Sequence, residues 1–126
     1  MPLIIEIRTH PHDFHRYATL GDYVGHGRLR FIQVSEMGNY KYEFLVALHE
    51  LIEQSLQIER GISEEVITEF DTTFKGEGEP GDSPEAPYYK EHQFATKIEK
   101  LVCEELGLDW SVYGRYLNEF LAKTEK

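Results

Sequence analysis

The spacing of the apolar residues changes near residue 40, and this change constrains the fold more than any other feature of the chain. Before it, residues 3–8, 17–24 and 28–35 form short runs rich in β-branched and aromatic residues, as is typical of strands. After it, apolar residues recur at spacings of three and four, which predicts helices. Strands followed by helices indicate an α+β domain, in which about four helices pack on a small antiparallel sheet of two or three strands.

Four helices are expected within residues 40–124. The first extends over about 41–61, the second begins after Ser63, the third covers 88–106, and the fourth follows Asp109. The residues expected to face the core are Phe44, Leu45, Leu48, Leu51, Ile52 and Leu56 in the first helix, Ile67 and Phe70 in the second, Phe94, Ile98, Leu101, Val102 and Leu106 in the third, and Trp110, Val112, Tyr113, Tyr116, Leu117 and Phe120 in the fourth.

The length of 126 residues predicts a single domain, residues 1–126, with strands in about 3–35 and helices in about 40–124. Residues 75–87 contain three Gly and three Pro, which indicates an ordered surface loop or lid rather than a boundary between domains. Hydrophobic residues make up 40% of the chain and charged residues 29%, so a core is available without a disulfide or a structural metal.

The charge and the cysteine content limit the partners and the compartment. A net charge of -10 argues against nucleic acid or an anionic membrane as the main partner. Cys103 is the only cysteine, which excludes an intrachain disulfide and fits a reducing compartment. The apolar run from Pro2 to Ile5 is too short for a signal peptide, and no later run approaches the length of a membrane span. We therefore expect a cytoplasmic protein.

A metal-ligand pattern lies within the first expected helix. His49 and Glu53 are four residues apart, so they project from one face of a helix. The H-E-x-x-H motif uses this spacing to supply two zinc ligands, and here Glu53 replaces its second histidine. Glu50 occupies the position of the general base that activates water in that motif. We therefore predict that His49 and Glu53 bind a metal ion and that Glu50 is the catalytic residue.

A second His/Glu pair lies on the third expected helix. His92 and Glu99 are seven residues apart and share a face, with the small Ala95 between them. Two helices that present these pairs to each other could hold one metal ion with three or four ligands, His49, Glu53, His92 and Glu99. With Glu50 added, they could hold two ions bridged by carboxylates. A set of imidazoles and carboxylates suits zinc, iron or manganese.

The function expected from these residues is divalent-metal binding of unassigned role, or metal-dependent hydrolysis of a small-molecule or peptide substrate. The loop over residues 75–87 would border the site, with Tyr88 or Tyr89 at its mouth and Asp71 as a further carboxylate. A rival site is the N-terminal cluster of His10, His12 and His15, although loop histidines near a terminus are usually exposed polar residues.

Two alternatives need no metal. The His/Glu pairs could be buried hydrogen-bonded networks that fix how the helices pack in a non-catalytic interaction protein, because such a pair on one helix is common and contributes only about 0.2–0.5 kcal/mol. In the other alternative the chain is a structural component, for example a homo-oligomer. The residues buried against its partner would then be Trp110, Tyr113, Tyr116 and Phe120.

Three stretches within about residues 47–110 carry a resemblance: ALHELIEQ, RGISEEVITEFD and EPGDSPEAPYYKEHQFATKIEKLVCEELGLDW. They resemble small proteins encoded in phage and prophage-bearing bacterial genomes, a family whose function is unassigned. The residues that the resemblance groups together are His49, Glu50, Glu53, Asp71, Glu91, His92 and Glu99.

A looser likeness is to minimal zincin-like metallopeptidases, in which an edge strand precedes the H-E-x-x-H helix. The run RLRFIQVS before the helix that carries His49 has this order. The likeness implies a zinc-dependent peptidase. Glu53 stands where that pattern requires His, and this more oxygen-rich set favours iron or manganese.

Overall fold

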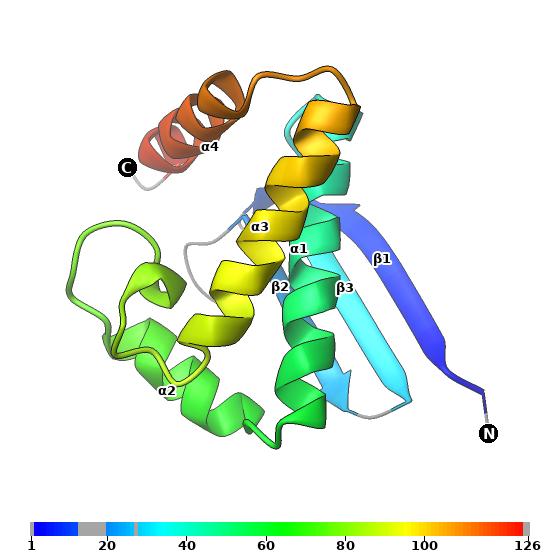
Figure 1. Cartoon of the computed structure of the whole chain (residues 1–126), viewed down its shortest axis with the longest axis vertical. Coiled ribbons are helices and arrows are strands. Elements are labelled where there is room, and N and C mark those ends of the chain that lie inside the picture. Colours follow the sequence, from blue (N-terminus) through cyan, green and yellow to red (C-terminus); the bar gives the residue numbers. More distant parts are fainter. Residues whose placement is uncertain (1, 13–19, 27, 125–126) are drawn as a thin grey trace.

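The computed structural model describes residues 2–12, 20–26 and 28–124. In this part of the chain a three-stranded sheet is followed by helices, as Figure 1 shows, so the predicted α+β class is confirmed. The elements are β1 (Ile4–His10), β2 (Gly21–His26), β3 (Leu29–Ser35), α1 (Tyr40–Glu59), α2 (Glu64–Thr73), the short 3-10 helix η2 (Pro80–Asp82), α3 (Tyr89–Glu105) and α4 (Trp110–Thr124).

The sheet has the strand order β1-β3-β2 and is mixed rather than wholly antiparallel. β2 and β3 form the expected antiparallel pair, from Gly21↔Val34 to His26↔Leu29. β1 pairs with β3 in parallel, from Ile4↔Leu29 to His10↔Ser35, so the antiparallel prediction is wrong for this pair. The physical reason lies in the connection: ten residues separate β1 from β2, far more than a hairpin turn needs, and they let β1 join the far side of β3.

The helices begin and end close to the predicted positions because the chain carries suitable capping residues. The side chain of Asn39 accepts hydrogen bonds from the backbone N–H groups of Lys41 and Tyr42 at the start of α1. Gly107 follows α3 with φ of 75°, a conformation that glycine adopts without a steric penalty. Every helix in the described ranges is too short or too polar to cross a lipid bilayer.

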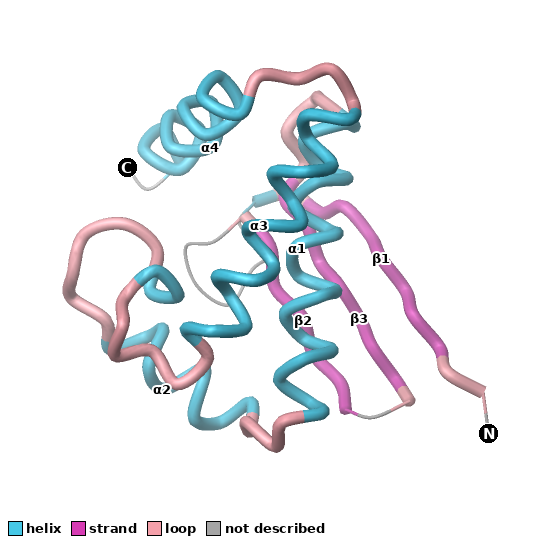
Figure 2. Tube along the Cα trace, in the orientation of Figure 1, coloured by secondary structure: helices cyan, strands magenta, loops and turns pink. Residues whose placement is uncertain are grey.

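The core is built in layers. α1 packs on β2 and β3, and α3 packs on α1, while β1 is the outermost strand on one side of the sheet (Figure 2). Ile32 and Val34 of β3 contribute to one core cluster together with Leu45 of α1 and Tyr113 of α4. A smaller cluster formed by Ile67, Ala86 and Tyr88 lies beneath α2 and the loop before α3.

The faces that α1 and α3 bury differ from the predicted apolar stripes. Phe44 is 51% exposed, Phe94 is 47% exposed and Leu101 is 53% exposed, although all three were expected in the core. The buried residues of α3 are Glu91, His92, Ala95, Glu99 and Cys103, and those of α1 include His49, Glu53, Gln54 and Gln57. Periodicity reports which face of a helix is apolar, whereas these two helices turn polar faces toward each other.

The neighbouring residues Phe44 and Leu45 test this description of burial, because both were expected in the core and only Leu45 is buried. Leu45 has no exposed surface, so we expect Leu45→Ala to lower the free energy of unfolding by about 2–5 kcal/mol, whereas Phe44→Ala should cost less than about 1 kcal/mol. Urea denaturation of the two variants beside the unchanged protein measures both values. A larger loss for Phe44→Ala would contradict the burial described above.

Candidate metal centre

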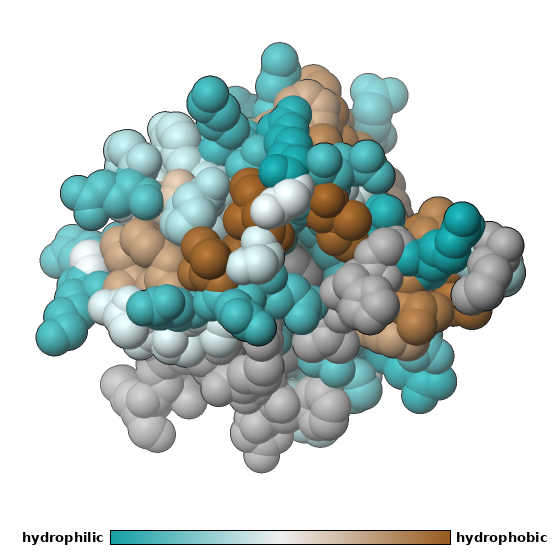
Figure 3. All heavy atoms as spheres, turned by 90° about the horizontal axis from the view of Figure 1, so that it is seen from below, coloured by the Kyte–Doolittle hydropathy of each residue, from teal (hydrophilic) through white to brown (hydrophobic). Residues whose placement is uncertain are grey.

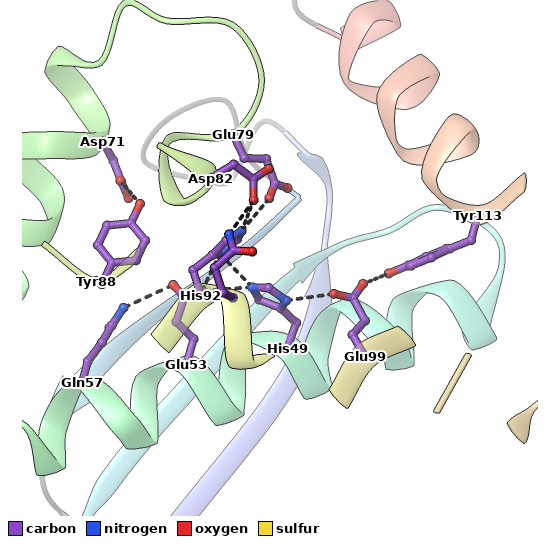
Figure 4. A network of polar contacts seen from close by, with 11 residues as sticks. His49, Glu53, Gln57, Asp71, Glu79, Asp82, Tyr88, His92, Glu99 and Tyr113 are labelled. Atoms are coloured by element: carbon purple, nitrogen blue, oxygen red, sulfur yellow. Dashed lines mark hydrogen bonds and ion pairs between the residues drawn. The ribbon is translucent and has the colours of Figure 1, made fainter. Parts of the chain in front are cut away.

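The two predicted His/Glu pairs meet at the interface between α1 and α3. His49 and Glu53 lie one turn apart on α1, and His92 and Glu99 lie two turns apart on α3 (Figure 4). All four are buried, with exposed fractions of 5–7%. Ala95 lies between the two α3 residues with no exposed surface, so the helices approach closely at this level. The pairing that was expected from helical spacing is therefore present.

Three side-chain atoms from these residues converge on one point. Glu53 Oε2 lies 2.9 Å from His49 Nε2 and 2.8 Å from His92 Nδ1. The two ring nitrogens are themselves 3.1 Å apart. These residues therefore form one of the groups in the described part of the chain that could hold a metal ion.

The opposite nitrogen of each imidazole faces a second carboxylate. His49 Nδ1 lies 2.8 Å from Glu99 Oε1, and Tyr113 donates its hydroxyl to Glu99 Oε2 at 2.5 Å. His92 Nε2 lies 3.1 Å from Asp82 Oδ1 and 3.2 Å from Glu79 Oε2. Carboxylates placed in this way fix the orientation of a ring and strengthen its other nitrogen as a ligand.

The remaining oxygen of Glu53 also has a partner. Gln57, one turn farther along α1, donates its amide N–H to Glu53 Oε1 at 3.2 Å. Glu53 is thus held by a neutral donor on one oxygen and faces two imidazoles with the other. Both carboxylates in the interface, Glu53 and Glu99, are oriented by a further side chain behind them.

The electrostatics of the site favour positive charge. Burial alone would lower the pKa of His49, but hydrogen bonds to Glu53 and Glu99 raise it well above its usual value. Burial opposes charge on His92 in the same way, yet Glu53 and Glu79 raise its pKa to about 10. Burial would raise the pKa of Glu53, but the two histidines lower it to about 2.

The raised pKa values of His49 and His92 favour two positively charged rings side by side when only protons occupy the site. If both inward nitrogens donate to Glu53 and both outward nitrogens donate to their carboxylates, the two rings are cationic with nitrogens 3.1 Å apart. One divalent cation at the point of convergence would replace the two inward protons and leave the outward N–H groups in place. The same atoms could therefore hold a metal ion, or one ring could be neutral and accept a hydrogen bond from the other across the 3.1 Å contact.

The loop before α3 borders the site, as expected for residues 75–87. Its carboxylates Glu79 and Asp82 contact His92, and Gly81 packs on the imidazole ring. A Cβ atom at Gly81 would lie 2.6 Å from Cγ of His92, so no larger residue fits without displacement. Tyr88, expected at the mouth, is buried and its ring meets that of His92 edge-on, with centroids 6.4 Å apart.

Three other residues that were expected near the site also make contacts outside it. Glu50 is half-buried against β2, where its Cγ would lie 2.8 Å from a Cβ atom at Gly21. Burial and the charge of Glu53 raise the pKa of Glu50 well above its usual value, although the charge of His49 opposes the shift. Asp71 accepts a hydrogen bond from Tyr88. Glu91 forms an ion pair of 2.7 Å with Arg60.

The rival N-terminal cluster is only partly within the described residues, because His15 lies outside them. His12 Nδ1 lies 2.8 Å from Ser35 Oγ, and its ring meets Phe120 edge-on. Neither His10 nor His12 belongs to a group of potential metal ligands in the described ranges. Cys103 is fully buried, as expected for a small core side chain, and burial together with the charge of Glu99 raises its pKa.

Sequence reasoning missed several residues that support the site. Gln57 could have been found, since it repeats the four-residue spacing from Glu53. Tyr113 was expected only as an apolar residue of the last helix, and nothing in its spacing links it to Glu99. Glu79 and Asp82 were expected only as part of a bordering loop.

The comparisons with known proteins add no assignment, because no family model, curated protein or solved structure matches this chain. The resemblance to small phage proteins and the likeness to zincins therefore stay predictions.

The pKa of His92 predicts how the stability of the metal-free protein depends on pH. An ordinary value of 6.5 is raised to about 10, so this group contributes stability that is fully present below about pH 6.5 and lost as the pH rises toward about 10. Glu53, whose pKa is lowered to about 2, contributes stability that is lost only as the pH falls below about 4.5 toward about 2.

We therefore expect the free energy of unfolding of chelator-treated protein to decrease from about pH 6.5 to about pH 10. Denaturant titrations across this range measure it, and His92→Gln, which has no titrating ring, should show a smaller decrease. An equal decrease in both proteins would contradict the role given to His92.

Proposed function

We propose that this protein binds one divalent metal ion through His49 Nε2, Glu53 Oε2 and His92 Nδ1. The observation that carries the proposal is the convergence of these three buried atoms, each pair 2.8–3.1 Å apart. A second partner behind each ligand residue supports it, since a carboxylate faces each outer ring nitrogen and Gln57 donates to Glu53. The predicted ligand Glu99 faces the outer nitrogen of His49, so we assign it the orienting role instead.

The chemistry of the three ligands bears on the identity of the metal. Two imidazoles and one carboxylate would suit iron, manganese or zinc.

The reaction that we propose for this centre is hydrolysis, with Glu50 as the proton acceptor. Glu50 follows His49 on α1, and its raised pKa reflects burial and the nearby charge of Glu53. A carboxyl group whose pKa is raised in this way holds a proton more strongly than an ordinary carboxyl group and is a better proton acceptor. A divalent ion with open positions supplies the Lewis acidity that polarises a carbonyl or phosphoryl oxygen.

The alternative is a non-catalytic interaction protein in which the same residues only fix the packing of α1 on α3. The completeness of the network favours it, since side-chain hydrogen bonds reach all four residues, His49, Glu53, His92 and Glu99. The two functions predict different effects of replacing a histidine: loss of bound metal in the first case, and only a loss of stability in the second.

We expect protein purified without an affinity tag to contain close to one equivalent of iron, manganese or zinc, and we expect His49→Ala to abolish this content. His10→Ala, which changes a histidine outside the site, is the matched control and should keep it. Elemental analysis by mass spectrometry provides the measurement. If the unchanged protein contains no stoichiometric metal and takes up none on titration, and His49→Ala only lowers its stability, the packing alternative is the correct one.

The proposed reaction has a separate test. We expect metal-loaded protein to hydrolyse a chromogenic ester or a fluorogenic peptide, and Glu50→Gln to keep the metal while lowering turnover by about 10²–10⁴-fold. Glu91→Gln, which removes a carboxylate paired with Arg60, is the control and should leave turnover unchanged. Full turnover in the Glu50→Gln variant would show that Glu50 is not the proton acceptor. It would leave the proposal of metal binding untouched, because metal content is measured separately.

A further inference from the structure

β1 forms an apolar edge of the sheet. The strand order places it outermost, and in the described part of the chain no strand pairs with its other side. Leu3, Ile4, Ile5 and Ile7 are each 42–54% exposed. Apolar surface is also visible in Figure 3 on the side where β1 lies in Figure 1. Exposed, apolar edge strands are templates for pairing with another strand.

The hydrogen bonds of β1 define which residues are available for such pairing. The N–H of Ile4 donates to the C=O of Arg28, just before β3, and the C=O of His10 accepts from the N–H of Glu36, just after β3. Because alternate residues of a parallel strand bond to the same neighbour, residues 4, 6, 8 and 10 bond toward β3. The N–H and C=O groups of Ile5, Ile7 and Thr9 therefore point away from the sheet.

The two faces of β1 differ in chemistry. Ile5 and Ile7 are paired in register with Arg30 and Ile32, so their side chains lie on the face of the sheet that α1 covers. Glu6 and Arg8 lie on the opposite face, where their side chains form an exposed ion pair of 2.9 Å. The strand thus carries an apolar stripe on one side and one charge of each sign on the other.

This pattern is self-complementary in one antiparallel register. If Ile7 lies opposite Ile7 of a second copy, the outward groups of residues 5, 7 and 9 all bond across the interface. Glu6 then lies opposite Arg8 of the second copy, twice by symmetry, in the closely spaced pairs of an antiparallel ladder. Sliding by one pair in either direction instead places Glu6 opposite Glu6 or Arg8 opposite Arg8, which like charges disfavour.

We propose that β1 is the interface of a symmetric homodimer, in which two three-stranded sheets join edge to edge through antiparallel β1 strands centred on Ile7. We assign a second copy of this chain as the partner, because Glu6 and Arg8 of one antiparallel strand lie opposite Arg8 and Glu6 of the other. None of the proposed metal ligands lies on β1, so this interface and the metal centre are independent of each other.

Sedimentation equilibrium should give twice the chain mass of 14.7 kDa for the unchanged protein. Either single charge reversal, Glu6→Arg or Arg8→Glu, should weaken dimerisation by roughly tenfold or more, because it places like charges opposite each other twice. The double variant Glu6→Arg/Arg8→Glu restores opposite charges and should dimerise as the unchanged protein does. Circular dichroism checks that all variants are folded.

Mixing the two single variants gives the sharpest result. Each alone repels itself, but a chain with two positive residues faces a chain with two negative residues in the proposed register, so the mixture should form heterodimers. Native mass spectrometry distinguishes them when one variant is isotope-labelled. A monomeric unchanged protein would overturn the proposal, and so would a dimer whose affinity neither of the two single charge reversals changes.

Discussion

The burial of Glu53 between two imidazoles is the interaction on which the helical part of the molecule depends. A carboxylate that is 5% exposed is costly unless its charge is compensated, and here His49 from the same helix and His92 from the facing helix both contact it. Because these partners lie on different elements, compensating one charge also fixes how α3 lies on α1. The helices can therefore leave Phe44, Phe94 and Leu101 exposed while they bury a polar face.

The order of the elements, the approximate bounds of the helices and the pairing of the two His/Glu sets could be predicted from sequence, whereas β2, expected within 17–24, extends to His26. Helical spacing alone placed His49 with Glu53 and His92 with Glu99, because residues on one helix have a fixed geometry. The contact partners of these residues could not be predicted in the same way. Tyr113 reaches Glu99 from α4, and Asp82 reaches His92 from a loop, so each depends on tertiary packing that no local period records.

In the sheet, too, the pairing of strands that are close in sequence could be predicted, whereas the pairing of distant strands could not. The antiparallel pairing of β2 with β3 follows from a short connection, which permits little else. The parallel placement of β1 depends on where a longer connection delivers the strand, and sequence did not specify it. That placement has a functional consequence, since it sets which groups of β1 face outward and which side of Glu6 and Arg8 is available to a neighbour.

Gly81 gives the loop before α3 a role beyond covering the site. Its backbone rests on the ring of His92, while the flanking Glu79 and Asp82 face the outer nitrogen of that ring. The inner nitrogen faces Glu53 on α1. The imidazole of His92 thus contacts both a surface loop and the interior of the protein. Binding events at the loop and at the interior site that both act on this ring affect each other's free energy by the same amount. If the centre binds a cation as proposed above, a molecule that binds the loop and shifts these contacts would change the affinity for that cation, and cation binding would change the affinity for that molecule by the same factor.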